Sequence, residues 1–302
     1  TEGSNNVLIG RTAGTALTTS TNNTALGTTA LATLTTDAAG RNTAIGQHSL
    51  NLCTGGRNTA LGYDAMRANT EGDHNFAAGD SAMLSNTTGC YNSAIGKGAL
   101  YANTTGEYNN AMGCGAMTNN TIGSYNNALG QHVLRNNIAG CYNNALGCGA
   151  LYCSTSGCYN NALGHSALWS NTTGDYNNAI GRQALGDNTT GCHNTAVGYR
   201  ALCKNTIGTD NAALGQCALF ANTEGNYNTA IGETALRCNT TGNSNAAIGG
   251  SALRCNTTGG YNVAVGDQAL KENTTGGCNT AIGYLALKES LSGDHNFAAG
   301  MC

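Results

Sequence analysis

The amino-acid sequence predicts a β-rich repeat solenoid of about eighteen 17-residue coils. One motif, typically Asn-x-Ala-(Ile/Leu)-Gly, recurs from Gly10 to Gly300, and fourteen equal 17-residue steps lead from Gly62 to Gly300. Composition agrees with this fold class. Charged residues are 10% of the chain, against roughly 25% in ordinary soluble domains, glycine occurs 44 times and proline is absent. Such a chain cannot build a thick globular core, so we expect a thin core of Ala, Ile and Leu that neighbouring coils cover.

The repeats extend over the whole chain. Only two early steps depart from this period: the step from Gly27 to Gly46 is longer by two positions, and the step from Gly46 to Gly62 is shorter by one. We therefore expect residues 1–302 to form a single continuous repeat array, irregular at 28–62 and regular at 62–300. No polar cap is recognisable at either end, which favours a segment of a longer fibre or subunits that dock end to end.

Each coil contains two kinds of spacing. Positions are numbered here from the glycine that closes the motif, which is position 0. Asn at −4, Ala at −2 and Gly at 0 alternate, which predicts one short strand, N-x-A-I/L-G. The constant residues after it, Ala at +3, Leu or Met at +4 and Asn at +7, have helical spacing. We therefore expect the segment x-x-A-L-x-x-N to form a tight helical turn or a second short strand. A glycine at +10 predicts a corner with positive φ.

Residues one repeat apart are expected to lie over one another, about 4.8 Å apart. Identical side chains would then form ladders along the stack. The expected asparagine ladder at −4 includes Asn143, Asn160, Asn177, Asn194, Asn211 and Asn228. The expected tyrosine ladder consists of Tyr91, Tyr108, Tyr125, Tyr142, Tyr159 and Tyr176, which we interpret as half-exposed packing residues.

The repeat Asn-x-Ala-Ile-Gly-x-x-Ala-Leu-x-x-Asn-Thr-Thr-Gly resembles two groups of proteins. It is similar to the tandem repeats of bacterial and phage tail-fibre-like proteins and, more distantly, to the head repeats of trimeric autotransporter adhesins. The resemblance spans residues 5–300. The adhesin heads have a shorter period, with a small-residue turn where residues 184–188 lie here. The resemblance implies an elongated, surface-displayed protein with a structural or adhesive role and no catalytic residues.

The 14 cysteines include two pairs that lie one coil apart at equivalent positions. These are Cys141 with Cys158 and Cys238 with Cys255. A separation of about 4.8 Å between stacked Cα atoms falls within the range that a disulfide spans. We expect at least one of these pairs to form a disulfide in an oxidising environment; scattered free or interchain thiols are the alternative.

The Asn-Thr-Thr segments also match the acceptor pattern for N-glycosylation. The candidate acceptors are Asn86, Asn103, Asn171, Asn188, Asn239, Asn256 and Asn273. The alternative is that these asparagines turn inward, to cap the turn or join a ladder, and we favour this second interpretation. The regular threonines leave open a remote alternative function, ice binding.

Little in the sequence indicates chemistry. The six histidines, His48, His74, His132, His165, His193 and His295, are read as single surface imidazoles at differing coil positions, and no constant pair of carboxylates recurs. We expect no enzyme activity, no cofactor and no metal. Net charge is −3 without evident clustering of either sign, so we expect no nucleic-acid partner. No apolar run is long enough to span a membrane.

The leading hypothesis is a structural subunit or shaft of an extracellular filament or fibre. Its expected partner is itself, through end-to-end or lateral contacts. The alternative is a receptor- or glycan-binding adhesin or tail-fibre region, with glycans or a cell-surface receptor as partners. Either function would place the chain outside the cell, at a cell or virion surface.

Overall fold

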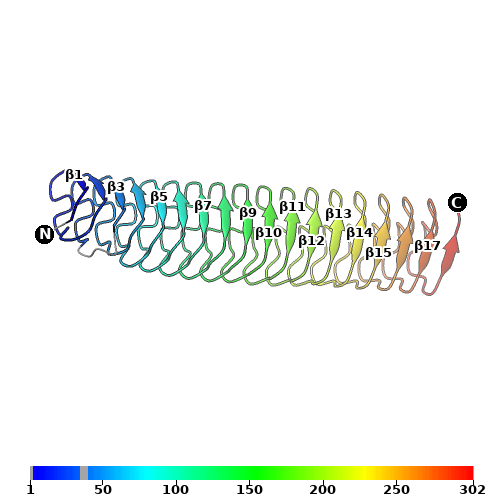
Figure 1. Ribbon diagram of the computed structural model, residues 1–302. Coiled ribbons are helices and arrows are strands. Elements are labelled where there is room, and N and C mark those ends of the chain that lie inside the picture. The colour runs from blue at the N-terminus through cyan, green and yellow to red at the C-terminus, as the bar shows by residue number, and fades with distance from the viewer. Residues whose placement is uncertain (1–2, 35–39, 302) are drawn as a thin grey trace. The chain divides into compact units, whose positions relative to one another are not determined.

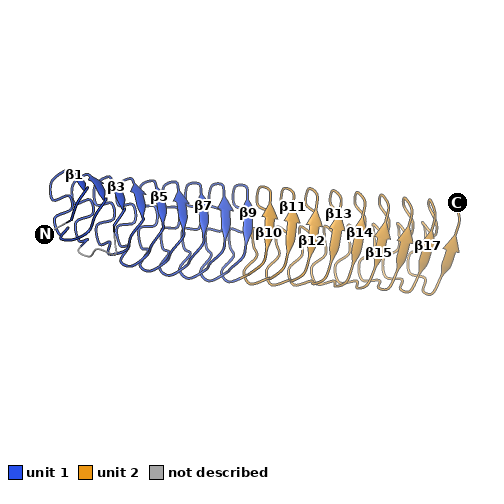
Figure 2. Cartoon of the chain, in the orientation of Figure 1, with its two compact units in different colours: residues 1–156 blue, residues 157–302 orange. Residues whose placement is uncertain are grey.

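The computed structural model describes residues 3–34 and 40–301. The chain divides into two compact units, residues 1–156 and 157–302 (Figure 2). Each unit is a β-solenoid in which all strands are parallel. The described residues contain no helix, and every strand is three residues long.

The strands begin at position −3 and end at −1 of each coil. In the first unit they are β1 (Val7–Ile9), β2 (Thr24–Leu26), β3 (Thr43–Ile45), β4 (Thr59–Leu61), β5 (Phe76–Ala78), β6 (Ser93–Ile95), β7 (Asn110–Met112), β8 (Asn127–Leu129) and β9 (Asn144–Leu146). In the second they are β10 (Asn161–Leu163), β11 (Asn178–Ile180), β12 (Thr195–Val197), β13 (Ala212–Leu214), β14 (Thr229–Ile231), β15 (Ala246–Ile248), β16 (Val263–Val265), β17 (Thr280–Ile282) and β18 (Phe297–Ala299).

Within each unit the strands pair in register with the next coil, as successive rungs (Figure 1). Alanine at −2 faces alanine at −2, as in Ala179 with Ala196. The two irregular steps keep this register, because Ala44 pairs with Ala25 on one side and with Ala60 on the other. Insertions and deletions in this region are therefore absorbed outside the strands. Residues 35–39 of the irregular region lie outside the described residues.

The core consists of three side chains from each coil. Ala at −2, Ala at +3 and Leu or Met at +4 are almost fully buried through most of both units, as for Ala179, Ala184 and Leu185. The expectation that Ile and Leu of the strand also lie in this core is wrong. Side chains of a strand alternate between its two faces, and Ala at −2 faces inward. The residue at −1 must therefore face outward, and Ile180 is 46% exposed.

The second half of the coil forms consecutive turns, so neither the helical turn nor the second strand occurs in the described residues. The residues at +2 and +4 adopt left-handed backbone conformations, for example Gln183 (φ 57°) and Leu185 (φ 50°). These conformations place Ala at +3 and Leu at +4 together on the inside, which explains why the spacing imitates a helix. A left-handed non-glycine residue costs about 1–2 kcal/mol, so other interactions must offset this cost in every coil.

Backbone hydrogen bonds between coils supply that offset. The amide of Leu185 at +4 donates to the carbonyl of Ala201, 3.0 Å away in the next coil. At the corner three consecutive amides, those of Thr87, Thr88 and Gly89, converge on the carbonyl oxygen of Thr104 at 3.0–3.1 Å. Most turns therefore form backbone hydrogen bonds to the adjacent coil as well as within their own coil.

The two recurrent glycines, at 0 and at +10, are needed for different reasons. Gly181 at position 0 has φ 131°, and a Cβ there would lie 2.5 Å from the carbonyl oxygen of Gly198. The glycine at +10 does not have the positive φ that we expected. A Cβ on Gly89 would instead lie 2.5 Å from the oxygen of Gly106 and 2.6 Å from Oδ1 of Asn86. Close approach of the next coil, rather than backbone conformation, therefore selects glycine at the corner.

Candidate functional surface

Asparagine at −4 forms a buried file of side-chain amides in each unit. The backbone amide of Asn194 donates to Oδ1 of Asn177 at 3.0 Å, and its Nδ2 donates to the carbonyl of Gly208 at 2.8 Å. Asn211 bonds to Asn194 in the same way. The six asparagines named for this ladder, Asn143, Asn160, Asn177, Asn194, Asn211 and Asn228, are at most 1% exposed. Each amide therefore links its own coil to its neighbour.

A second file of asparagine amides lies at +7, where the glycosylation pattern falls. Nδ2 of Asn103 donates to Oδ1 of Asn86 at 2.8 Å and to the carbonyl of Gly106 at 3.0 Å. All seven candidate acceptors, Asn86, Asn103, Asn171, Asn188, Asn239, Asn256 and Asn273, are 0% exposed. A glycan on Nδ2 would have to displace these hydrogen bonds. Glycosylation at these sites stays a prediction, one that the folded geometry disfavours.

Cys53 takes the place of asparagine at +7 in the coil of β3. It is fully buried, receives a hydrogen bond from Nδ2 of Asn69 at 3.5 Å and donates to the carbonyl of Gly55 at 3.2 Å. Burial raises the pKa of this thiol from 9.0 to about 11. Because the thiolate is the reactive form of cysteine, burial and the raised pKa both disfavour reactivity of Cys53.

The raised pKa of Cys53 predicts alkaline loss of stability. The folded chain holds the proton more tightly than the unfolded chain, so the stabilisation is complete below pH 9.0 and is lost as pH rises toward about 11. The upper limit of this loss is about 3 kcal/mol. Denaturant unfolding at several pH values should show a smaller alkaline loss in Cys53→Ser than in the native chain. Equal pH profiles for the two proteins would contradict this assignment.

The tyrosine file lies at −5, immediately before the buried asparagine. In the first unit Tyr91, Tyr108 and Tyr125 stack with ring centroids 4.9 Å apart and planes within 8° of parallel. Tyr142 stacks on Tyr125 at 4.9 Å, and in the second unit Tyr176 stacks on Tyr159 at 4.8 Å. Parallel rings cover each other's faces, so the file offers solvent its ring edges and hydroxyl groups. Desolvation, followed by the charges of neighbouring tyrosines, raises the pKa of Tyr108.

Two histidines extend this file, which the sequence interpretation missed. His74 stacks on Tyr91 with centroids 4.8 Å apart, and His193 stacks on Tyr176 at 5.1 Å. His295 holds the same coil position. These three histidines therefore share one position, contrary to the expectation of differing positions. The signal was available, since each precedes the asparagine at −4 as the tyrosines do.

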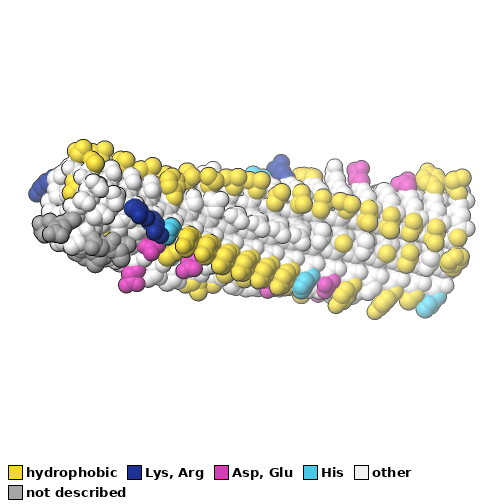
Figure 3. Space-filling model, in the orientation of Figure 1, with side chains coloured by type: hydrophobic (Ala, Val, Ile, Leu, Met, Phe, Trp, Pro, Cys, Tyr) yellow, Lys and Arg dark blue, Asp and Glu magenta, His cyan; other side chains and the backbone are white. Residues whose placement is uncertain are grey.

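The outer face of the sheet in each unit carries a row of exposed aliphatic side chains at −1. Rows of hydrophobic side chains are visible along the surface in Figure 3. In the first unit the exposed members of the row at −1 include Leu26, Ile45, Leu129 and Leu146, which are 38–48% exposed. In the second unit they include Leu163, Ile180, Leu214, Ile231, Ile248 and Ile282, which are 39–50% exposed. We call this feature the aliphatic row.

Several cysteines lie at −6, where the side chain accepts a backbone hydrogen bond. Sγ of Cys90 accepts a hydrogen bond from the backbone amide of Asp73 at 3.3 Å, and Sγ of Cys192 accepts one from the backbone amide of Asp175 at 3.3 Å. Aspartate does the same elsewhere, since Oδ1 of Asp175 receives the amide of Cys158 at 2.7 Å. Position −6 therefore favours short side chains with an acceptor atom, which explains its cysteines without disulfides.

The two predicted disulfides differ in their surroundings. Cys141 lies in the first unit and accepts the amide of Ser124 at 3.3 Å, whereas Cys158 lies in the second unit. Cys238 and Cys255 lie in adjacent coils as unbonded thiols, and Sγ of Cys255 contacts Oε2 of Glu272 at 3.5 Å. Burial, followed by Glu272, raises the pKa of Cys255 and disfavours the thiolate that exchange needs. Both disulfides stay predictions.

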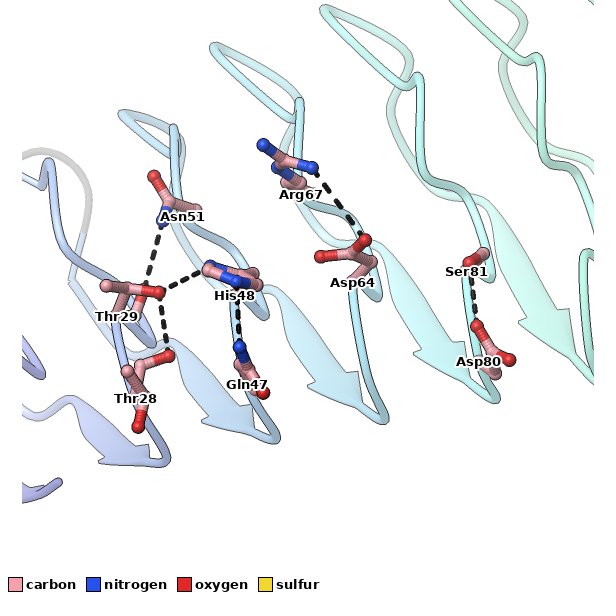
Figure 4. Close-up of polar contacts among 9 residues, drawn as sticks. All are labelled: Thr28, Thr29, Gln47, His48, Asn51, Asp64, Arg67, Asp80 and Ser81. Carbon is pink, nitrogen blue, oxygen red and sulfur yellow. Dashed lines mark hydrogen bonds and ion pairs between the residues drawn. The ribbon is translucent and has the colours of Figure 1, made fainter. Parts of the chain in front are cut away.

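Side chains at the variable positions of the turn segment form polar contacts within a coil and between adjacent coils. In the first unit Oγ1 of Thr29 lies 2.6 Å from Nδ1 of His48, whose Nε2 lies 3.0 Å from Nε2 of Gln47 (Figure 4). No carboxylate takes part in the contacts of His48 with Thr29 and Gln47, so this histidine lacks there the group that orients a catalytic histidine. Among residues 3–34 and 40–301, no three His, Cys, Asp or Glu side chains are grouped as metal ligands would be.

Comparisons with known proteins leave the chain without an assigned family. No protein-family model matches it, and no curated protein matches it. The resemblance to fibre and adhesin repeats therefore stays a prediction. Within the described part of the chain, no helix has the length and apolar character needed to cross a membrane.

Proposed function

We propose that the chain is a non-catalytic structural subunit or shaft of an extracellular filament, in which its partner is another copy of itself. Two features of each unit support a mechanical role. First, adjacent coils are joined by backbone hydrogen bonds, by asparagine side-chain hydrogen bonds and by stacked aromatic rings. Second, these interactions recur in successive coils, so the array resists local opening between any two adjacent coils.

The aliphatic row is the observation that carries the proposal. Exposed apolar patches that extend over many residues mark interaction sites rather than ordinary surface. Each unit carries such a row on its strand face, with an exposed aliphatic side chain at −1 in many of its coils. A second copy of this chain has the same rise per coil, so the same contact can recur at every coil without loss of register. Few other partners share that period.

The alternatives receive less support. At +8 the threonine hydroxyls donate to the next coil, as Oγ1 of Thr87 does to the carbonyl of Thr104 at 3.0 Å. These hydroxyls are therefore engaged within the protein and are not free for an ice surface. At −3 the outward row mixes Thr with Asn, Ala, Val and Phe. Receptor or glycan binding and ice binding stay predictions, and the extracellular location rests on the resemblance of the repeats.

Substitution in the aliphatic row tests the proposal. The change is Ile180→Ser with Leu214→Ser and Ile248→Ser, three exposed residues of the second unit. We expect the native chain to form assemblies that grow with concentration, visible by electron microscopy and sedimentation. The triple variant is expected to sediment as a single chain of 30.5 kDa over the same concentrations.

The matched control removes apolar surface from a different file. Tyr227→Ser with Tyr261→Ser changes residues that are 65% and 68% exposed at −5. This control should still assemble. A native chain that stays monomeric at every concentration, or a triple variant that assembles like the native chain, would refute the proposal.

A further inference from the structure

Four cationic residues occupy position +5 in four successive coils of the second unit. They are Arg237, Arg254, Lys271 and Lys288, and all are half-buried. Backbone hydrogen bonds fix their order: the amide of Cys238 donates to the carbonyl of Arg254 at 3.0 Å, and that of Cys255 to the carbonyl of Lys271 at 2.9 Å. The amide of Glu272 donates to the carbonyl of Lys288 at 3.0 Å. We call these four residues the cationic file.

This file corrects the expectation that neither sign of charge clusters. Arg237, Arg254, Lys271 and Lys288 are scattered in the sequence but lie one above another in space, because each is one repeat from the next. Like charges at such close spacing repel one another. The repetition is therefore unfavourable for the isolated chain and requires another explanation.

Internal counter-charges cover the file only in part. Nζ of Lys271 lies 3.6 Å from Oε1 of Glu272, and the guanidinium of Arg237 lies 6.0 Å from the Phe220 ring centroid. Among the described residues, neither Arg254 nor Lys288 forms an ion pair within 4.0 Å. The flanking position +6 adds only Glu272 and Glu289 over the same four coils. At the adjacent position +6, two carboxylates thus flank four cations, and two more, Glu233 and Asp267, lie at +1 in the same coils.

We propose that the cationic file binds a linear acidic polysaccharide, whose carboxylate groups pair with successive coils. A one-residue-wide file suits a narrow chain with spaced charges. Nucleic acid fits less well, because single strands need free aromatic faces for base stacking. The aromatic ring beside the file, Phe220, lies between the guanidinium groups of Arg200, at 4.8 Å, and Arg237.

This site is independent of the proposed self-assembly. The aliphatic row lies on the strands at −1, whereas the cationic file lies on the turn segment at +5. A filament could therefore hold polysaccharide on one surface while its copies contact each other through another.

Binding of the full chain to polygalacturonate tests the proposal. The charge variant is Arg254→Gln with Lys271→Gln. Its control is Lys97→Gln with Arg182→Gln, which removes the same charge from exposed positions elsewhere. Calorimetry at low ionic strength should show binding by the native chain, and affinity about tenfold weaker in the charge variant. The control should stay within about twofold of the native chain. Binding should weaken as salt is added.

Three results would overturn the proposal. The first is no binding of polygalacturonate, or equal binding of neutral dextran. The second is equal affinity of the charge variant and its control. The third is tighter binding of single-stranded or duplex DNA with the same dependence on Arg254 and Lys271, which would assign the file to nucleic acid. The unfolding midpoint of the charge variant should be no lower than that of the native chain, and its sedimentation should be unchanged. A loss of binding then cannot be ascribed to unfolding or to failed assembly.

Discussion

Gly96→Ala is expected to destabilise the first unit by about 3 kcal/mol or more, whereas Gly98→Ala in the same coil costs only about 1–2 kcal/mol. Gly96 has φ 128°, a conformation almost confined to glycine. A Cβ there would also lie 2.7 Å from the carbonyl of Gly113 in the next coil. Neither the backbone of Gly96 nor that of Gly113 can move without breaking the strand register.

Gly98 is the matched control for this experiment. It is also left-handed, at φ 63°, but a Cβ there has no heavy atom within 4 Å. Many coils carry a non-glycine residue at the same position, such as Gln183 with φ 57°. Denaturant unfolding of the two variants measures the difference. Equal losses of stability would show that close contact between coils does not constrain position 0.

Asn103→Ala is expected to destabilise the first unit by about 3 kcal/mol. The substitution removes the hydrogen bonds from its Nδ2 to Asn86 and Gly106, and the bond that its Oδ1 accepts from Asn120 at 2.8 Å. Oδ1 of Asn86 is left buried without that donor, and each unsatisfied buried polar group costs about 1–3 kcal/mol. Thermal unfolding followed by circular dichroism gives the change in stability.

Asn119→Ala provides the comparison for Asn103→Ala. Asn119 lies on the surface and its Nδ2 donates to Oδ1 of Asn136 at 3.0 Å, in an exposed bond between neighbouring coils. Its loss should cost less than about 1 kcal/mol, because water replaces the partner. If both variants lost the same stability, the buried file at +7 would not contribute more than surface amides do.

The sequence period was sufficient to predict the strands, the alanine core and the asparagine files. In-register stacking follows from a constant 17-residue step, and it places Asn177 and Asn194 in contact without further information. The outward position of Ile180 could also have been deduced, because alternation along a strand excludes the neighbour of an inward Ala179 from the core. Hydrophobicity alone favours burial of Ile180, but the alternation of the strand places it outside.

The turn segment could not be deduced from spacing alone. Inward residues at +3 and +4 are compatible both with a helical turn and with left-handed residues at +2 and +4. Gly98, Gly115 and Gly149 at +2, with Gly14 at +4, carry a direct sequence signal, since glycine favours positive φ. The histidine extension and the cationic file were missed for another reason. Both are patterns of coil position: their members differ in residue type but lie one repeat apart.

Scalar coupling through hydrogen bonds tests the central claim most directly. The claim is that strand residues form backbone hydrogen bonds to the equivalent region of the adjacent coil, one repeat away along the chain. The amide of Thr195 donates to the carbonyl of Asn211 at 2.8 Å, and that of Asn178 to the carbonyl of Asn194 at 2.8 Å. Nuclear magnetic resonance should therefore detect correlations between these two amide nitrogens and the carbonyl carbons of Asn211 and Asn194 in the following coil. Correlations of the same amides to carbonyls within their own coil would contradict the stacked arrangement.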